Sequence, residues 1–349
     1  MTIAVAVSGG RDSLMALALL RRQERDLVAV HAQLADATPP EVLDGLRENC
    51  HALDVPLHVV DLRSRFEELV VAPYIQSYLE GRTPNPCAWC NARIKFGLLL
   101  DAVREQGAKT LATGHYARLA LTDHGPALWR GADPAKDQSY FLALLTPNQL
   151  AQAAFPLADR RKQDVLPELE RLGLTPPLPG ESQEVCFISG DYRDFLASRL
   201  SKLPPVGPIE LEDGRSVGEH KGLWQYTIGQ RKGLDVAWSE PLYVLRKDLA
   251  ANILVVGERA RLFSDTCRLE SINFLVPTTA WPRDLRLQTR YRQRPESARL
   301  ASAPEARQSP IPDTLVLTYP EPREPAAPGQ IGVIYSAEGQ VLAGGMISS

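Results

Sequence analysis

Short apolar runs alternate with helical patterns over the first third of the chain. The apolar runs are four or five residues long, which is typical of buried strands, and they occupy 3–7, 27–30, 57–60 and 110–113. Between them the apolar residues recur every three or four positions, which predicts helices at 14–22, 41–53, 66–79 and 94–105. This alternation predicts an α/β fold with a doubly wound parallel sheet that carries helices on both faces.

The pattern changes twice farther along the chain. A hairpin is expected at 117–130, and the proline-rich run at 174–180 is expected to form a loop that delivers Cys186. After about residue 200, proline, glycine and short alternating segments dominate, which predicts an all-β region with a small domain and then a compact barrel. We therefore expect an α/β domain at 1–200, a small β domain at 201–262 and a C-terminal β-barrel at 263–349.

Composition limits the function classes. The apolar run at 3–7 is too short for a signal peptide, and no stretch approaches the roughly 20 apolar residues that span a bilayer. We therefore expect a cytoplasmic protein without a membrane partner. Five cysteines without a secretion signal do not indicate a structural disulfide framework.

Charge places a condition on any binding of nucleic acid. The formal net charge is −3, so RNA binding requires that basic residues gather on one face. Residues 281–300 contain six arginines. Strand alternation within this stretch predicts that Arg286, Arg290 and Arg292 share one face with Gln288.

A glycine-containing segment, Ser8-Gly9-Gly10-Arg11-Asp12-Ser13, joins the first predicted strand to the first predicted helix. The glycines let backbone N–H groups approach a phosphate, and the helix N-terminus favours negative charge. Asp12 can hold the start of the helix or a Mg²⁺ ion. No Walker lysine or GxGxxG pattern is present. The segment resembles the loop of enzymes that split ATP into AMP and pyrophosphate; the alternative is a tight turn without a ligand.

Three cysteines are candidates for chemistry. Cys87 and Cys90 are separated by two residues, a spacing typical of metal sites and redox pairs, and Cys186 is the only plausible third thiol. Thiolates act as nucleophiles, carry sulfur and form disulfides, whereas the alternative for each is a buried structural cysteine. Cys50 and Cys267 lie in ordinary surroundings. An ATP loop followed by these thiols indicates activation by ATP and then sulfur chemistry.

Several motifs together resemble the bacterial tRNA-specific 2-thiouridylase family, nearly from end to end. The matching segments are 83–91, 95–96, 112–118, 136–142, Ser182-Gln183 with 186–188, 220–222, 226–234 and 328–330. The resemblance implies a pyrophosphatase-loop α/β domain that binds adenine nucleotide, followed by a small β domain and a β-barrel. It also implies ATP-dependent 2-thiolation of the wobble uridine in tRNA, with Mg²⁺ as cofactor and a cysteine desulfurase or sulfur-donor relay protein as partner.

The family's residue roles are implied for the matching positions. Cys90 would be the nucleophile and Cys186 the persulfide carrier. ATP would be held by Ala6, Val7, Ser8, Gly9, Gly10, Arg11, Asp12, Ser13, Ala32 and Gly114. The target base would be surrounded by Asn85, Pro86 and Cys87, and tRNA would be contacted by His115, Lys136, Asp137, Gln138, Arg290, Tyr291 and Gln330.

Three positions depart from the family pattern. Arg11 replaces a common valine, Ala32 replaces a larger apolar residue that packs on adenine, and Cys87 replaces an aspartate with acid/base work. Cys87 also allows a second route, in which Cys87, Cys90 and Cys186 hold three irons of an iron–sulfur cluster and the fourth iron binds hydrosulfide. The competing hypothesis is the persulfide route with Cys87 as a spare catalytic-site thiol.

Two other functions remain open from the sequence. A different ATP pyrophosphatase, such as an amidating ligase, explains the loop but leaves the cysteine motifs without a role. The other is a non-catalytic RNA-binding or metal-carrying protein, which tRNA-dependent formation of AMP would exclude. No DNA partner is expected.

Overall fold

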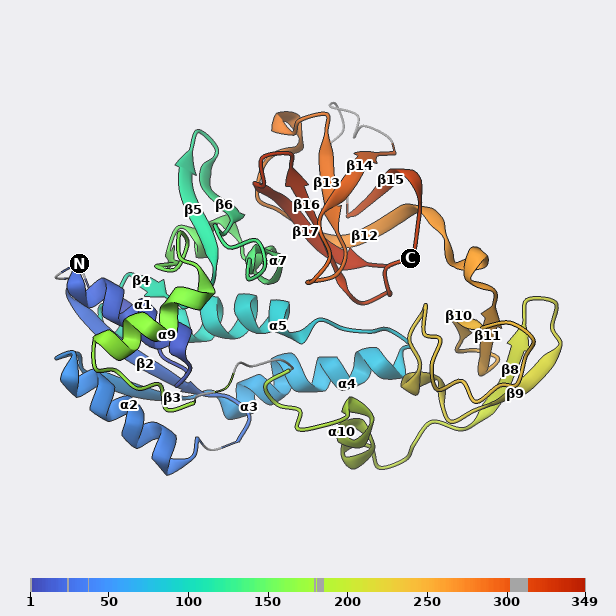
Figure 1. Ribbon diagram of the computed structural model, residues 1–349, viewed down its shortest axis with the longest axis horizontal. Coiled ribbons are helices and arrows are strands. Elements are labelled where there is room, and N and C mark those ends of the chain that lie inside the picture. Colours follow the sequence, from blue (N-terminus) through green and yellow to red (C-terminus); the bar gives the residue numbers. More distant parts are fainter. Residues whose placement is uncertain are drawn as a thin grey trace.

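Figure 1 shows three bodies in the computed structural model, which describes residues 2–23, 25–36, 38–178, 180, 185–301 and 313–348. An α/β domain lies at the N-terminal side, a β-barrel lies above the long helical layer, and a small β-sheet lies at the opposite end. The predicted fold class is confirmed: a parallel sheet comes first, a small β domain second and a closed barrel last.

The N-terminal sheet has five parallel strands in the order β3-β2-β1-β4-β7. They are β1 (Ile3–Ala6), β2 (Leu27–Gln33), β3 (Leu57–Asp61), β4 (Thr110–Ala112) and β7 (Ala153–Ala154). Neighbouring residues of β1 face opposite sides, since Ala4 belongs to one hydrophobic cluster and Val5 to another. The sheet is therefore covered on both faces, as its apolar runs predict.

The α-helices of the described residues all lie before residue 200. They are α1 (Arg11–Arg22), α2 (Pro40–Ala52), α3 (Arg63–Phe66), α4 (Ala72–Leu79), α5 (Pro86–Trp89), α6 (Leu100–Glu105), α7 (Ser139–Leu142), α8 (Pro147–Leu150), α9 (Lys162–Arg171) and α10 (Tyr192–Arg199). Two π-helical stretches, η1 (Glu67–Val71) and η2 (Cys90–Leu99), join α3 to α4 and α5 to α6. In the described ranges no helix is long and apolar enough to cross a membrane.

The remaining strands form a hairpin and two further sheets. The hairpin is β5 (Ala117–Thr122) with β6 (Gly125–Arg130). The small sheet has the order β10-β11-β8-β9, with β8 (Gly207–Leu211), β9 (Ser216–His220), β10 (Tyr243–Asp248) and β11 (Ile253–Gly257). The closed barrel is β12 (Ser264–Phe274), β15 (Thr314–Arg323), β14 (Glu296–Leu300), β13 (Leu285–Gln288), β16 (Ile331–Ser336) and β17 (Val341–Ile347). Short 3₁₀ turns occur at η3 (Leu223–Gln225), η4 (Arg259–Leu262) and η5 (Thr278–Ala280).

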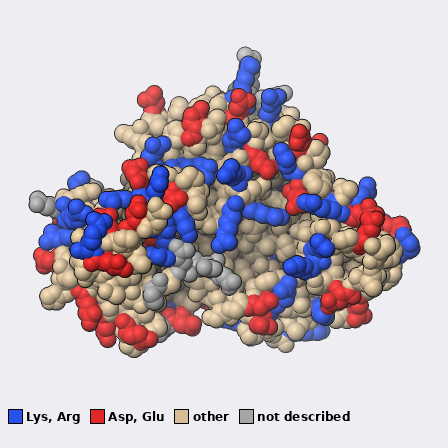
Figure 2. Space-filling view, in the orientation of Figure 1, with Lys and Arg blue, Asp and Glu red and all other residues tan. Residues whose placement is uncertain are grey.

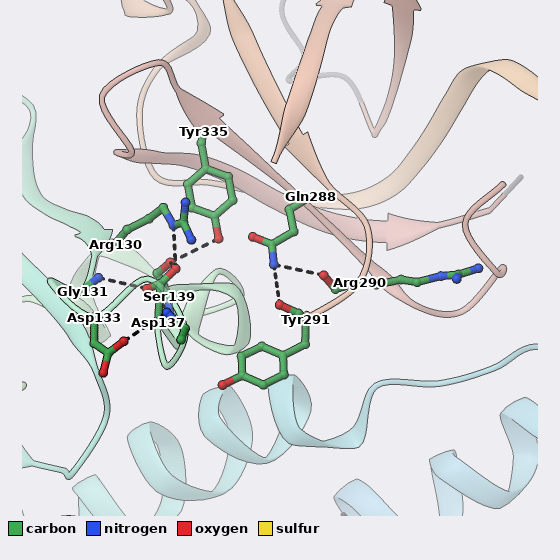
Figure 3. Close-up of polar contacts among 10 residues, drawn as sticks. Arg130, Gly131, Asp133, Asp137, Ser139, Gln288, Arg290, Tyr291 and Tyr335 are labelled. Atoms are coloured by element: carbon green, nitrogen blue, oxygen red, sulfur yellow. Dashed lines mark hydrogen bonds and ion pairs between the residues drawn. The ribbon is translucent and has the colours of Figure 1, made fainter. Parts of the chain in front are cut away.

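The arginine-rich strand is shorter than its alternation predicts. Strand β13 ends at Gln288, whose side-chain Nε2 donates to the carbonyl oxygens of Arg290 at 3.0 Å and Tyr291 at 2.8 Å (Figure 3). These bonds turn the chain out of the sheet. The prediction that Arg286, Arg290 and Arg292 share one strand face with Gln288 is therefore wrong: Gln288 is buried, and the two later arginines follow the turn.

Specific hydrogen bonds fix the barrel on the α/β domain. The Tyr140 hydroxyl donates to the carbonyl oxygen of Ile331 at 2.8 Å. The Asn273 amide donates to the carbonyl oxygens of Ala143 and Leu145, each at 2.8 Å. Because these partners are buried backbone groups, the interface holds one defined orientation of the barrel above helix α7.

Candidate active site

The loop between β1 and α1 is built around backbone groups. Gly9 has φ 87°, a conformation that favours glycine, and the loop closes because Ser8 N–H donates to Ser13 Oγ at 3.1 Å. Ser13 Oγ in turn donates to the carbonyl oxygen of Gly10 at 2.9 Å. Helix α1 begins at the next residue, so its N-terminal N–H groups face the carboxyl end of the sheet. This is the geometry that a phosphate-binding loop requires.

Gly114 completes the wall of this loop. A Cβ at position 114 would lie 2.6 Å from the carbonyl carbon of Asp12 and 2.7 Å from the nitrogen of Ser13. Only glycine allows this close approach of two backbone segments. Ala32 lies two positions beyond Val30, the partner of Ala6, and thus also at the carboxyl edge. The structure therefore brings the predicted ATP residues together at one edge of the sheet.

Lys162 is a further candidate site residue, which no sequence motif marks. Its ammonium pairs with one carboxylate oxygen of Asp12, while the Tyr116 hydroxyl donates to the other at 2.9 Å. A cavity of about 670 Å³ next to the loop is lined by residues that include Arg11, Lys136 and Lys162. Lys162 starts α9, more than a hundred residues after the loop, and no local motif marks it. Tertiary folding alone brings this positive charge next to the loop between β1 and α1.

The segment with Cys87 and Cys90 starts a helix. Asn85 is the N-cap of α5, and its side-chain oxygen accepts from Ala88 N–H at 3.3 Å, while Pro86 takes the first helical position. Cys90 begins the π-helical stretch and is buried, whereas Cys87 is half-buried. π-Helical turns occur often at functional sites. Asn85 and Pro86 are themselves buried, so they shape the thiol segment directly.

Both C-terminal domains hold the loop that precedes this helix. Thr83 N–H donates to the carbonyl oxygen of Pro328 at 2.7 Å, and Gln330 Nε2 donates to the carbonyl oxygens of Thr83 at 2.8 Å and Pro84 at 3.2 Å. From the small β domain, the hydroxyl of Thr227 lies 3.3 Å from that of Thr83. The position of the thiol segment therefore depends on all three domains.

Cys186 lies in a second thiol-bearing segment, residues 186–188, and is exposed. The next residue, Phe187, anchors this segment with edge contacts to Phe66 and Tyr74, at centroid distances of 5.6 and 5.3 Å. All five cysteines are free thiols in the structure. The predicted Ser182-Gln183 motif lies outside the described residues.

Electrostatics link the three thiols to one lysine. Burial raises the pKa of Cys90 to about 12 and that of Cys87 to about 11, and desolvation by neighbouring residues raises the pKa of Cys186 although its side chain reaches the surface. The positive charge of Lys95 opposes the rise in all three pKa values. The Cys186 charge acts on both of the other thiols, so the three lie within electrostatic range. Lys95 therefore supplies a positive charge to the site of the three thiols, although the sequence motif that contains it gives no sign of this role.

Three predicted tRNA contacts have structural partners instead of an open surface. His115 is buried, its Nδ1 lies 2.7 Å from the Thr113 hydroxyl, and burial followed by the Lys95 charge holds its pKa well below the usual range. Gln138 Oε1 accepts from Tyr116 N–H at 3.1 Å. The third, Asp137, is the most extensively bonded of the set.

Asp137 is the centre of the polar network in Figure 3. Its carboxylate accepts from Arg130 Nε at 2.8 Å, from Gly131 N–H at 3.0 Å and from the Ser139 hydroxyl at 3.0 Å. The Ser139 hydroxyl also lies 3.2 Å from the Tyr335 hydroxyl of the barrel. Asp137 thus positions the loop between the two domains, and a direct tRNA contact by this side chain stays a prediction.

The other predicted tRNA residues are placed differently. Arg290 is exposed, while Tyr291 is half-buried and packs its ring on Phe141 at a centroid distance of 4.4 Å. Lys136 lines the cavity beside the nucleotide loop. Gln330 uses its amide to hold the thiol segment. Figure 2 shows Lys and Arg gathered toward the middle of the face drawn, with Asp and Glu mostly toward its edges.

An iron–sulfur cluster would have to be held by the three thiols, and a Mg²⁺ ion by Asp12. Among the described residues, no three or more His, Cys, Asp or Glu side chains are arranged to hold a metal ion. The thiols therefore do not form a ready ligand set for an iron–sulfur cluster. Both oxygens of Asp12 are also engaged, by Tyr116 and Lys162, so this carboxylate is not an open Mg²⁺ ligand.

Comparison with known proteins gives the family. Three family models match in succession: a tRNA methyl transferase HUP domain at residues 1–190, a tRNA methyl transferase PRC-barrel domain at 193–258 and an aminomethyltransferase beta-barrel domain at 264–347. The tRNA-specific 2-thiouridylase MnmA of Nitratidesulfovibrio vulgaris Miyazaki F is 51% identical over 99% of both chains. The chain belongs to the tRNA-specific 2-thiouridylase family. The tRNA-specific 2-thiouridylase MnmA of Oleidesulfovibrio alaskensis is 49% identical over 100% of this chain and 99% of its own.

Solved structures show more distant likeness to this 2-thiouridylase family member. The U34-tRNA thiolase NcsA from Methanococcus maripaludis with its [4Fe-4S] cluster has a TM-score of 0.37 and 18% identity, covering 57% of this chain and 65% of its own. The assignment to the 2-thiouridylase family depends on the full-length relatives, which match all three domains.

Proposed function

We propose that this protein is a tRNA-uridine 2-sulfurtransferase that uses ATP to replace the C2 oxygen of the wobble uridine with sulfur, in the cytoplasm. The observation that carries the proposal is the joint presence of a glycine phosphate loop and two thiol segments linked by one lysine charge. Full-length similarity to 2-thiouridylases supports it. An amidating ligase would leave Cys90 and Cys186 without a role.

Activation comes first, because uracil oxygen is a poor leaving group. The C2 oxygen attacks the α-phosphorus of ATP, the α–β bridging bond breaks, and pyrophosphate departs. The N–H groups at the start of α1 and the Lys162 ammonium stabilise the charge that develops on the pyrophosphate. Mg²⁺ would enter with the ATP phosphates and supply additional charge compensation.

Sulfur transfer follows on the thiol side. A persulfide on Cys186, loaded by a desulfurase or relay protein, attacks C2 with its terminal sulfur, and AMP leaves. The exposure of Cys186 supports loading by a protein partner. The Cys90 thiolate then attacks the Cys186 sulfur, which breaks the S–S bond, releases 2-thiouridine and forms a Cys90–Cys186 disulfide. A reductant must reopen that disulfide before the next turnover.

Cys87 and Lys95 adjust this chemistry. A half-buried thiol with a pKa of about 11 is protonated at neutral pH, so Cys87 can donate a proton and is a poor base. The Lys95 charge favours the thiolate form of Cys90 and Cys186. The competing hypothesis is a cluster held by the three thiols, which the persulfide steps do not require. Full activity of iron-free protein with a persulfide donor would exclude a required cluster, whereas activity that follows iron content would establish one.

The direct test of the function uses labelled ATP, a tRNA transcript and a persulfide donor. We expect AMP and pyrophosphate in a tRNA-dependent reaction, together with 2-thiouridine in the digested tRNA. ADP as the product, or AMP formation that does not depend on tRNA, would refute the proposal.

A further inference from the structure

A second polar cavity lies in the small β domain, away from the nucleotide loop. Its volume is about 380 Å³, and the charged residues among its lining are Arg193, Lys221, Lys232 and Asp235. Three cations thus face one carboxylate. The lining contains no aliphatic side chain, and its neutral members include Gln225 and Tyr226. Part of the wall is the segment 226–234, a sequence motif that the ATP and sulfur chemistry leaves without a role.

The loop that forms this wall is fixed by its own side chains. Gln230 Oε1 accepts from Thr227 N–H at 3.0 Å, and Gln230 Nε2 donates to the carbonyl oxygen of Lys232 at 3.0 Å. Gly229 and Gly233 have φ of 83° and 76°, so the loop uses turns that favour glycine. Lys232 therefore extends from a defined backbone, a form of preorganisation that reduces the cost of ordering on binding.

The cations differ in how they are held. Arg193 is fixed, since its Nη2 donates to the carbonyl oxygen of Gln225 at 3.2 Å and its Nη1 pairs with Asp191 at 3.0 Å. Lys221 pairs with Asp235 at 2.9 Å, but both side chains are about two-thirds exposed, at 70% and 67%. Such an exposed pair contributes little and exchanges readily for another anion. None of the ion pairs formed by the described residues involves Lys232.

The same loop touches both sulfur segments. The Tyr192 hydroxyl, six residues after Cys186, donates to the carbonyl oxygen of Gln225 at 3.1 Å. Thr227 lies against Thr83, which precedes the Cys87–Cys90 helix. The cavity is therefore attached to the two segments that present the thiols. A ligand bound there would sit at a defined place relative to the sulfur site.

We propose that this cavity binds a backbone phosphate of the tRNA substrate, outside the nucleotide that is presented to Cys90. The proposal rests on tRNA being the substrate. A base that reacts at a buried thiol must leave its stack, so the backbone beside it has to be held. Lysine and arginine with amide donors suit a phosphate. A protein partner would instead favour aliphatic or exposed aromatic anchors, whereas this lining has no aliphatic side chain and its one aromatic ring, Tyr226, is buried.

The test measures binding of a tRNA transcript to the full-length protein across salt concentrations, without ATP. Four variants are compared with the unaltered chain: Lys232→Ala, Lys221→Ala/Lys232→Ala, Asp235→Asn and the control Arg215→Ala. Asp235 has φ 54°, which asparagine also tolerates, so Asp235→Asn removes the carboxylate charge with little change to the backbone. Arg215 is an exposed arginine of the same domain that does not line the cavity.

We expect the double variant to bind tRNA about tenfold more weakly, with a salt slope reduced by roughly one for each phosphate that the protein no longer neutralises. Asp235→Asn should bind more tightly than the unaltered protein, and Arg215→Ala should not differ from it. Unchanged affinity and slope in the double variant would overturn the inference. Unchanged tRNA binding combined with slower sulfur transfer from a persulfide carrier protein would also overturn it, because the cavity would then bind that carrier protein. If the unaltered protein binds no tRNA, the proposed function itself fails.

Discussion

The nucleotide site and the sulfur site are stabilised in different ways. The phosphate loop is held within the α/β domain, by the Ser13 hydroxyl and by its close approach to Gly114. The segment that presents Cys87 and Cys90 is instead held from outside, by Gln330 of the barrel and by Thr227 of the small β domain. The ATP half is thus preorganised locally, whereas the sulfur half depends on the docking of three domains.

This difference has a consequence for catalysis. Substitutions within the α/β domain can impair either half, but substitutions in the other two domains should impair sulfur transfer and leave nucleotide binding intact. Substitutions at four places test that separation, and their expected effects run from the largest to the smallest.

The largest effect is expected for the two reactive thiols. Cys90→Ser and Cys186→Ser should each reduce 2-thiouridine formation to background, because neither sulfur can be replaced by a hydroxyl. Nucleoside analysis of the tRNA measures the product. Cys50→Ser and Cys267→Ser are the controls, since both thiols are buried in hydrophobic clusters. Normal product from either active-site variant would refute the assignment.

Lys162→Met should impair the nucleotide half alone. The substitution removes the ammonium that is proposed to contact the ATP phosphates, and a hydrogen bond to a charged group contributes about 1.5–3 kcal/mol, so the KM for ATP should rise by roughly 10- to 100-fold. Steady-state kinetics with varied ATP measure the change, and Arg171→Met at the other end of α9 is the matched control. If only the KM for tRNA rises, Lys162 contacts RNA and not the phosphates of ATP.

Gln330→Ala should impair the sulfur half alone. It removes two hydrogen bonds to the backbone before the thiol helix, and a small displacement of Cys90 should lower kcat by about tenfold. Binding of ATP should not change. Comparison of kcat with tRNA affinity separates two roles: lower affinity with unchanged kcat would mean that Gln330 contacts tRNA and does not position the thiols.

The smallest effect is expected from Lys95→Met, as a shift in pH dependence. Burial raises the pKa of Cys90 to about 12, and the Lys95 charge lowers it, so loss of the charge moves that pKa upward. The thiolate fraction at any pH below the pKa should therefore fall, and the alkaline rise of activity should move to higher pH. Alkylation of Cys186 against pH measures the same change on the exposed thiol. Lys95→Arg, which keeps the charge, should behave like the unaltered protein.

Sequence patterns predict the parts of this protein that local rules govern. The apolar runs give the parallel strands, and Ser8-Gly9-Gly10 gives the loop, because glycine conformations and helix starts are local. The arginine-rich strand is predicted too long because the Gln288 side chain ends it, and alternation alone contains no signal for that bond. The family resemblance marks the two thiols, Cys90 and Cys186, that are proposed to react.

The roles that sequence patterns do not predict depend on contacts between residues that are distant in sequence. Lys162 meets Asp12 across 150 residues, and Gln330 meets Thr83 across 247. Asp137 is expected from the family resemblance to contact tRNA, but folding buries it among Arg130, Gly131 and Ser139. Tertiary packing decides such roles, and a single sequence contains no direct record of it.

The most direct test of the account is one turnover without reductant, followed by mass spectrometry of the protein. Protein loaded with one persulfide is mixed with tRNA and ATP, and its peptides are mapped after the reaction. We predict a Cys90–Cys186 disulfide in an amount equal to the 2-thiouridine and AMP formed. Equal amounts of product with both thiols still free would contradict the proposed roles of Cys186 as the persulfide carrier and Cys90 as the thiol that attacks it.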